Sequence, residues 1–347
     1  MPLATSYGLG DRVSEKGARE SLDNTIRRTE PESCPLFSTL SRGPKAQAIL
    51  SEWIVDDLDE VKFTGHVDGA PLSFANGFKD KTEGRVRFGN RIQQFQREFA
   101  VSPQAEAVNV AGPDNLYAMS KSKALLEMRR DIEACLGSDQ ESQAGASNAG
   151  DLMDALGTWT NPADTSIYDS TGKLAHRSVT KSRFNLTGTT GSPGDLTEDA
   201  FREQLQAVYE LHGSAPSYKL FGGPSVINSL ADMTRVSSSA NAFSYQLTQN
   251  VGDGVLKLQV QEYISDWGRV YLVPSLFLGR SSGVAFNDTA RNRAYLLPSD
   301  SGISLRFLED VKTIDLDDVD GGGKRGLCRA MLTLSCGSAG KPLGSIV

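Results

Sequence analysis

One stretch of the 347-residue sequence, Asn115–Gly137, has the length and pattern of a long helix that the rest of the fold must accommodate. A turn-forming Gly-Pro pair precedes it, Asn115 is a suitable N-cap, and Gly137 is suited to end it. At 1.5 Å of rise per residue the helix is expected to be about 33 Å long. Its broad apolar stripe comprises Tyr117, Ala118, Leu125, Met128, Ile132, Cys135 and Leu136. The pattern predicts a helix packed along one side against a core.

The same stretch carries a second, narrower apolar line formed by Met119 and Leu126, seven residues apart and roughly opposite the broad stripe. A helix with two apolar lines is expected to be covered from two sides. The predicted i,i+4 ion pairs on the remaining surface are Lys123–Glu127 and Arg129–Glu133. Taken alone, the stretch is typical of an ordinary core helix.

Residues 49–102 predict a long, thin hairpin with one acidic and one basic limb. The acidic residues are Glu52, Asp56, Asp57, Asp59, Glu60 and Asp68, and the basic residues are Lys79, Lys81, Arg85, Arg87, Arg91 and Arg97. The segment has too few apolar residues for a core of its own, although Phe95, Phe99 and Val101 alternate as in a strand. We expect the limbs to pair with each other, or each with another copy of the chain. A solvated loop of this length is uncommon in compact domains.

The remaining sequence predicts a mixture of helices and strands. Residues 1–30 are polar and are expected to form an arm ordered by a neighbour, and Ser138–Gly150 is expected to be a mobile loop. Predicted helices cover Leu196–Leu211 and Val226–Met233. Predicted strands are Ala48–Val55, Tyr218–Phe221, two within residues 255–278, Ala294–Leu297, Leu305–Leu308 and Gly326–Cys336.

Composition and motifs do not point to catalysis or to a metal. The net charge of −7 gives no sign of a basic nucleic-acid-binding surface, and no signal peptide or membrane-spanning run is present. The four cysteines lack metal spacing and are expected to be reduced packing residues. The three histidines are His66, His176 and His212, and none is near a cysteine. The segment Asp315–Gly321 resembles a calcium loop but has Val319 at a ligand position and no closing glutamate, so it is interpreted as an acidic turn.

Several short strings, in their joint order and spacing, resemble a known family. They are Pro35-Leu36-Phe37, Glu52-Trp53 with Asp56 and Leu58, Asn90-Arg91-Ile92-Gln93, Val101-Ser102, Glu127 with Arg130-Asp131-Ile132-Glu133, Tyr263-Ile264-Ser265-Asp266-Trp267-Gly268, Val273-Pro274, Ala294–Pro298, Leu305–Leu308 and Met331-Leu332-Thr333-Leu334. Together they resemble phage major capsid proteins of the HK97 fold, specifically the SU10-type major head proteins, over roughly residues 30–340.

The resemblance implies an α+β fold with the named parts of an HK97-like subunit. It implies an N-terminal arm at residues 1–48, an extended E-loop hairpin at 49–102, a peripheral domain with its spine helix at 103–150, an axial domain at 151–254, and returning strands of both domains at 255–347. Only about thirty residues precede the matched region, so we expect scaffolding either by a separate protein, which the initiator methionine favours, or by a domain removed before Met1.

The function implied by the resemblance is structural, with no enzymatic activity and no cofactor. Such proteins assemble as hexamers and pentamers into an icosahedral virion shell in the cytoplasm of a host bacterium. Implied partners are other copies of the chain, scaffolding, portal or decoration proteins, and packaged double-stranded DNA contacted non-specifically, with no membrane. The candidate inter-subunit contacts are Glu52, Trp53, Asp56, Asp57, Arg85, Arg87, Arg91, Met119 and Leu126. The alternatives are an encapsulin-like non-viral shell of the same fold and an unrecognised α/β enzyme or binding module.

Overall fold

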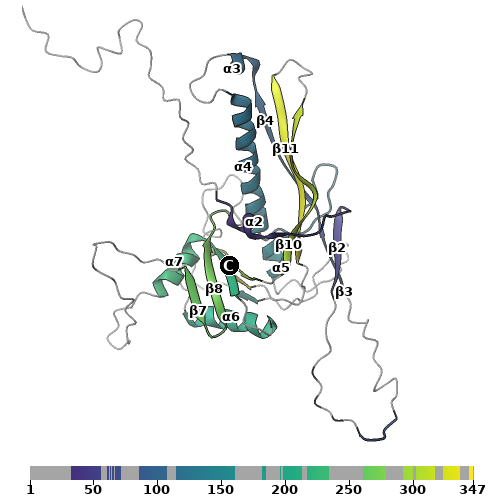
Figure 1. The fold of residues 1–347 in the computed structure, drawn as a ribbon, viewed down its shortest axis with the longest axis vertical. Helices are drawn as coiled ribbons and strands as arrows, with labels where there is room; N and C mark the ends of the chain where they lie inside the picture. Colours follow the sequence, from purple (N-terminus) through teal and green to yellow (C-terminus); the bar gives the residue numbers. More distant parts are fainter. Residues whose placement is uncertain are drawn as a thin grey trace, which may run out of the picture.

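The structure is a computed structural model that describes residues 33–55, 61, 63, 65, 67–71, 86–107, 115–160, 182–184, 196, 198–212, 217–233, 261–278, 292–299, 302–316, 323–336 and 344–346. The predicted N-terminal arm up to residue 30, and with it His66 and His176, lies outside this part of the chain. The described residues form two sheets, a two-stranded hairpin and the helices packed on them (Figure 1).

The first sheet has four strands, in the order β1-β10-β11-β4. The strands are β1 (Ser41–Arg42), β4 (Gln93–Val101), β10 (Ile303–Leu316) and β11 (Lys324–Cys336). The long antiparallel pair β10–β11 and the neighbouring β4 run beside helix α4 in the upper part of Figure 1. β10 extends well beyond the short strand predicted for it. It contains register shifts between Phe307 and Glu309 and between Glu309 and Lys312.

Helix α4 spans Leu116–Leu136 and confirms the prediction for this stretch. Asn115 is its N-cap, and the side-chain Oδ1 accepts a hydrogen bond from Ala118 N at 2.9 Å. Gly137 is the C-cap at φ −88°, so the helix ends without the left-handed conformation that only glycine adopts easily. Ala118 is exposed, contrary to its predicted place on the buried stripe.

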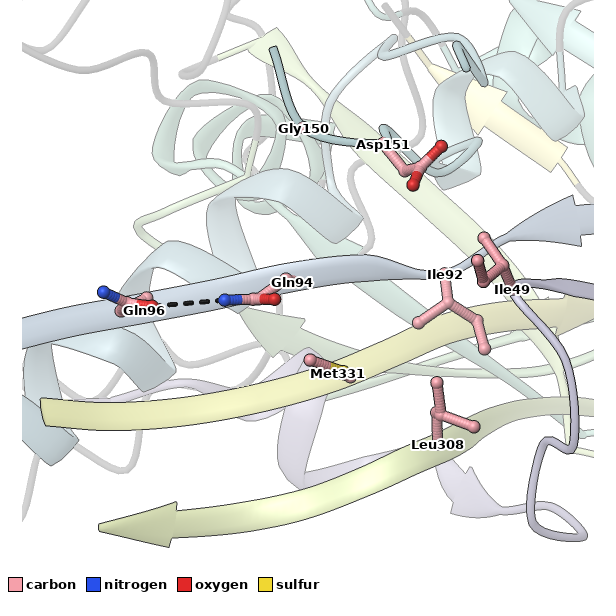
Figure 2. Close-up of a pocket in the computed structure, with 8 residues that line it drawn as sticks. All are labelled: Ile49, Ile92, Gln94, Gln96, Gly150, Asp151, Leu308 and Met331. Carbon is pink, nitrogen blue, oxygen red and sulfur yellow. Dashed lines mark hydrogen bonds between the residues drawn. The ribbon is translucent and has the colours of Figure 1, made fainter. Parts of the chain in front are cut away.

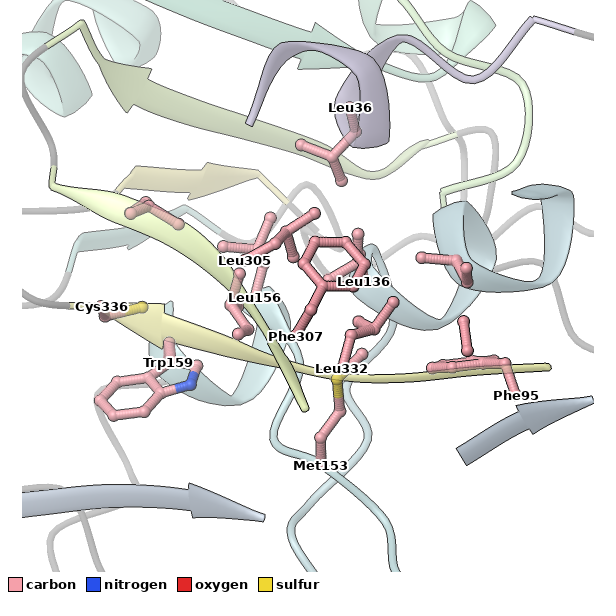
Figure 3. Close-up of a cluster of buried hydrophobic side chains, with 14 of the residues drawn as sticks. Leu36, Phe95, Leu136, Met153, Leu156, Trp159, Leu305, Phe307, Leu332 and Cys336 are labelled. Carbon is pink, nitrogen blue, oxygen red and sulfur yellow. The ribbon is translucent and has the colours of Figure 1, made fainter. Parts of the chain in front are cut away.

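Helix α4 packs against the face of the first sheet that carries the alternating apolar side chains of β4. Phe95, Phe99 and Val101 are buried on this face, as predicted from their spacing. On β11 the buried face carries Cys328, Ala330 and Leu332, while Leu327 and Met331 are only partly buried on the other face. The largest apolar cluster lies here, and Figure 3 shows its side chains converging from α2, β10, β11 and the segment 153–159.

The second sheet has six strands, in the order β5-β12-β9-β6-β8-β7. Its strands are β5 (Ser182–Phe184), β6 (Ser217–Gly222), β7 (Glu262–Ser265), β8 (Gly268–Pro274), β9 (Ala294–Pro298) and β12 (Gly344–Ile346). Helices α6 (Glu198–His212) and α7 (Pro224–Met233) contribute to a second apolar cluster with this sheet. Phe201, Leu205 and Val208 form the buried stripe of α6, whose helix the sequence predicted at Leu196–Leu211.

Three short helices complete the described fold. They are α2 (Pro35–Thr39), α3 (Pro103–Ala107) and α5 (Leu156–Thr160). The hairpin strands are β2 (Leu50–Val55) and β3 (Val86–Arg91), which pair antiparallel with Leu50 opposite Arg91. The pairing of β2 with β3 ends at Arg91. The chain then continues from β3 directly into β4, which belongs to the first sheet. The limbs therefore pair with each other at their base.

Residues 138–150 form a tightly bonded loop, which argues against the predicted mobility. Gln143 and Leu152 exchange backbone hydrogen bonds of 3.2 and 3.0 Å. Gln140 Nε2 donates to Gln93 Oε1 at 2.6 Å and to the Met153 carbonyl at 2.8 Å. The small polar composition suggested mobility, but backbone bonds within the loop and the bond from Gln140 to Gln93 of β4 hold it in place.

All four cysteines are free thiols, and Cys34, Cys328 and Cys336 are buried, in agreement with the predicted packing role. None of the helices among the described residues is long and apolar enough to span a membrane.

Candidate assembly site

The paired strands β2 and β3, called here the root of the hairpin, are fixed to the rest of the subunit by an aromatic cluster. Trp53 on β2 lies opposite Phe88 on β3, and both side chains are buried. The ring of Trp159 from α5 lies 5.7 Å from that of Trp53 and 6.4 Å from that of Phe88, between centroids. Aromatic contacts of this kind add stability beyond the area they bury. The side chain of Trp53, a predicted inter-subunit contact, therefore packs within its own subunit.

Arg306 of β10 covers Trp53 from the side of the first sheet. Its guanidinium carbon lies 5.5 Å from the ring centroid of Trp53, and its Nη1 donates to Ser51 Oγ at 3.2 Å. Burial lowers the pKa of Arg306 below its ordinary value, although an arginine stays charged at neutral pH. The cation therefore links β2 to β10 through both a ring contact and a hydrogen bond.

Asn90 fixes the other strand of the root. Its buried Nδ2 donates to the Leu334 carbonyl at 2.8 Å and to the Asp154 carbonyl at 3.1 Å. Its Oδ1 accepts from Asp154 N at 2.8 Å. Next to it, Arg91 lies 3.7 Å from Asp151 in an ion pair within the subunit. The root of the hairpin is therefore rigidly placed with respect to the first sheet.

Large apolar side chains are exposed on β2 and among the described residues of the segment between β2 and β3. Phe63 is 95% exposed and Ile54 is 69% exposed. The other exposed apolar side chains of this segment are Ile49, Val61 and Val67. Isolated exposed apolar residues are ordinary, but several within one segment make it a candidate interaction surface. Sequence reasoning emphasised charge in this segment and missed this apolar series.

The charged candidates on the hairpin are described only in part. The side chain of Glu52 points outward, as expected for its position between the inward-facing Ser51 and Trp53. Arg87 pairs through its backbone with Ile54 of β2. Asp56, Asp57 and Arg85 lie outside the described residues.

A groove of about 450 Å³ lies beside the hairpin root, on the sheet face that points away from α4. Figure 2 shows it between the strands that carry Gln94, Met331 and Leu308 and the loop that carries Asp151. It is lined by Ile49, Ile92, Gln94, Gln96, Gly150, Asp151, Leu308 and Met331. Apart from Asp151, which pairs with Arg91, the lining is aliphatic and uncharged polar, and this suits a protein segment better than a charged small molecule.

Met119 and Leu126 of α4 are each partly buried. They lie on the helix as predicted, seven residues apart, and neither is fully exposed. Whether a neighbouring copy covers them stays a prediction.

The environment of Glu133 differs from the one that the sequence predicted. It was predicted to pair with Arg129 on the helix surface, but it is fully buried. Its carboxylate accepts hydrogen bonds from Leu36 N at 3.0 Å, Phe37 N at 2.6 Å and Ser275 Oγ at 2.9 Å. Burial raises the pKa of Glu133, against the lowering effect of these three donors. The other predicted pair, Lys123–Glu127, is present at 3.9 Å.

The described residues contain no group of three or more side chains that could hold a metal ion. Asp315, at the start of the predicted acidic turn, accepts a hydrogen bond from Tyr117 Oη at 2.7 Å. This bond lowers the pKa of Asp315 and contributes, after burial, to raising the pKa of Tyr117 to about 12. Asp315 therefore joins the end of β10 to α4.

Comparisons with known proteins agree on one family and one fold. The family model described as SU10 major capsid protein matches residues 5–344. A comparison with curated proteins found no match.

Solved structures similar to this chain include three shells. The capsid asymmetric unit of cyanophage A-1(L) is 13% identical with a TM-score of 0.61, covering 95% of this chain and 96% of that one. The capsid of cyanophage P-SCSP1u is 10% identical with a TM-score of 0.59, covering 94% and 92%. The capsid of an empty GTA particle is 10% identical with a TM-score of 0.59, covering 98% and 99%. At these identities the similarities establish the fold.

Proposed function

The chain belongs to the SU10 major capsid protein family, and we propose that its copies assemble as hexamers and pentamers into the icosahedral shell of a tailed phage. Its fold is the HK97-like fold of phage capsid proteins, as the sequence resemblance predicted. The phage capsids among the structural neighbours do not favour the encapsulin-like alternative. The role is structural rather than catalytic, and its place is the virion.

The observation that carries this proposal is the contrast between the buried and the exposed side chains of this segment. Its root is anchored inside the subunit by Trp53 and Asn90, while Ile54 and Phe63 are exposed to solvent. A folded subunit gains little from exposing large apolar side chains. Burial of these side chains against neighbouring copies offsets that cost and supplies a driving force for assembly.

The division of the chain follows from the same proposal. Residues 1–48 form the arm, 49–102 the E-loop, 103–150 the peripheral domain with the spine helix, 151–254 the axial domain, and 255–347 the returning strands. The pairing of β2 with β3 supports an extended hairpin in the second of these parts. The packing of α4 along the first sheet supports a spine helix in the third.

Charge is proposed to set the registry between neighbouring hairpins. The acidic limb from Glu52 to Asp68 and the basic residues from Lys79 to Arg87 complement each other between copies, while Arg91 and Arg97 pair with Asp151 and Asp131 of their own subunit. Packaged double-stranded DNA is contacted non-specifically, and scaffolding, portal or decoration proteins are further partners. Assembly takes place in the cytoplasm of the host bacterium.

The test reverses two charges of the basic limb. The double variant Arg85→Glu/Arg87→Glu is expected to remain folded by circular dichroism and to form few or no shells by electron microscopy and light scattering. The control Lys123→Glu/Arg202→Glu makes the same change in net charge at exposed positions of α4 and α6 and is expected to form shells. Normal shells from the Arg85→Glu/Arg87→Glu variant would refute the role of the charges. A chain that forms no shells, capsomers or sheets under any condition would refute the proposed function.

A further inference from the structure

The carboxylate of Glu133 joins three segments that are far apart in the sequence. Leu36 and Phe37 belong to α2, Glu133 belongs to α4, and Ser275 follows β8 of the second sheet. All three hydrogen bonds end on the two oxygens of one fully buried side chain. The Oε1 atom of Glu133 alone accepts from both Leu36 N and Ser275 Oγ.

The carboxylate of Glu133 and its three donors form one junction, in which each group depends on the others for its hydrogen bonds. A buried carboxylate is costly unless donors replace its water. Leu36 N and Phe37 N lie in the first turn of α2, where amides have no acceptor within the helix. The hydroxyl of Ser275 supplies the third donor from the second sheet. If one donor is lost, fewer hydrogen bonds offset the cost of burying the carboxylate. The packing that keeps Glu133 buried against the other donors is then less stable.

The charges around the junction come from few groups. Arg129 on α4 attracts the carboxylate and donates from Nη2 to Ser38 Oγ at 3.4 Å. Arg130 lies over the ring of Phe277, 4.8 Å from its centroid. The thiol of Cys34, the N-cap of α2, is a further titratable group close to the junction, and burial raises its pKa. Pro35–Thr39 and residues 275–278 contain no titratable side chain.

We infer that α2 is a strap whose docking on α4 is coupled, through the carboxylate of Glu133, to the contact between α4 and the second sheet at Ser275. Loosening either contact loosens the other, because both share one buried charge and coupling between two sites is reciprocal. A pull on the N-terminal arm is thereby transmitted to the junction of the two sheets. The coupling is a property of the subunit and does not depend on the proposed shell.

A second link keeps α4 attached to the second sheet when the junction at Glu133 is altered. Arg293 Nη1 donates to the Gly137 carbonyl at 2.9 Å, and Tyr295 Oη donates to the same carbonyl at 2.8 Å. Arg293 Nη2 also donates to Asp139 Oδ2 at 2.5 Å. These bonds satisfy the end of α4 from β9 and its flanking residue. Variants at the junction are therefore expected to fold.

The test is amide hydrogen exchange on the full-length chain, measured by mass spectrometry in peptides that cover residues 34–40 and 275–278. Ser275→Ala removes the donor on the sheet side only. We expect exchange in residues 34–40 to become about tenfold faster, as for the loss of one hydrogen bond to a charged group. The control Ser229→Ala removes a hydroxyl that bonds within α7 and is expected to leave residues 34–40 unchanged.

The reciprocal variant acts from the arm side. Leu36→Ala removes an apolar side chain buried under the strap and leaves Glu133 and Ser275 in place. Exchange is expected to become faster at Ser275, whose amide is bonded to the Gly222 carbonyl at 2.9 Å. The coupling is wrong if each variant changes exchange only in its own segment, with the other segment within about twofold of the parent chain.

Discussion

Asn90 and Asp154 hold each other by a reciprocal pair of hydrogen bonds. Asn90 Nδ2 donates to the Asp154 carbonyl at 3.1 Å, and Asp154 N donates to Asn90 Oδ1 at 2.8 Å. A side-chain amide thus bonds the segment before α5 much as a neighbouring strand would. The same Nδ2 also donates to Leu334 on β11, so one residue at the hairpin root joins two other parts of the chain.

Replacing this amide should destabilise the subunit. Asn90→Leu leaves the Asp154 amide and the Leu334 carbonyl buried without their partner, at an expected cost of about 3 kcal/mol in unfolding free energy. Urea denaturation of the dissociated subunit measures the change. Gln96→Leu, at an exposed position of the next strand, is the control and should change stability by no more than about 0.5 kcal/mol. Equal effects of the two variants would contradict the role of Asn90.

Removing the aromatic anchor should release the hairpin root. Trp53→Ala is expected to cost about 3–5 kcal/mol, because it leaves a cavity beside Trp159 and Arg306. The fluorescence of Trp159 should shift to longer wavelength as water reaches its ring. Trp53→Phe keeps an aromatic ring and should retain most of the stability. A Trp53→Ala variant as stable as the Trp53→Phe variant would show that the ring does not anchor the root.

Phe63 should matter for assembly and not for folding. Its side chain is 95% exposed, so Phe63→Ser is expected to change the unfolding free energy of the subunit by no more than about 0.5 kcal/mol. The same variant should raise the protein concentration needed for shell formation, which light scattering measures. Phe63→Leu retains an apolar side chain and should assemble at close to the normal concentration. If Phe63→Ser assembled as readily as the unaltered chain, the exposed ring would have no part in assembly.

Glu133 should make stability depend on pH in a defined direction. Burial raises its pKa in the folded chain above the ordinary value of 4.5. Between these two values the folded chain binds more protons than the unfolded chain, so the contribution of Glu133 to stability grows as the pH falls through the raised pKa. This contribution is complete below pH 4.5 and is lost as the pH rises.

The measurement compares the unaltered chain with Glu133→Gln, which cannot titrate. The difference in unfolding free energy, unaltered chain minus variant, should be larger at about pH 5 than at about pH 8. Glu127→Gln, at a partly exposed position of the same helix, is the control. A difference that shrinks on acidification would mean that the hydrogen bonds from α2 and Ser275 outweigh burial.

The parts of the fold that sequence predicts well are those encoded locally. The bounds of α4 follow from the Asn115 cap and the apolar stripe, and the buried face of β4 follows from the alternation of Phe95, Phe99 and Val101. Both signals lie within a few residues of the element they specify. The family resemblance supplied the fold because it combined many such strings over the whole chain.

The buried position of Glu133 could not be predicted from local sequence in the same way. Its spacing from Arg129 indicates a surface ion pair, but its partners lie 96, 97 and 142 residues away in the sequence. Nothing local distinguishes a glutamate that will be buried under a strap from one that faces solvent. The loop at residues 138–150 was misjudged for the same reason, since Gln93 and Asp154 hold it from outside.

The order of strands in the first sheet has a consequence for synthesis on the ribosome. β4 ends at Val101, but its partner β11 begins at Lys324, and β1 near the N-terminus pairs with β10. At about 5–20 residues per second, the intervening chain takes roughly 10–45 s to emerge. The sheet that carries α4 can therefore close only after β11 has left the ribosome. A prematurely terminated chain lacks the partner of β4, so we expect incomplete products to be excluded from shells without a separate checkpoint.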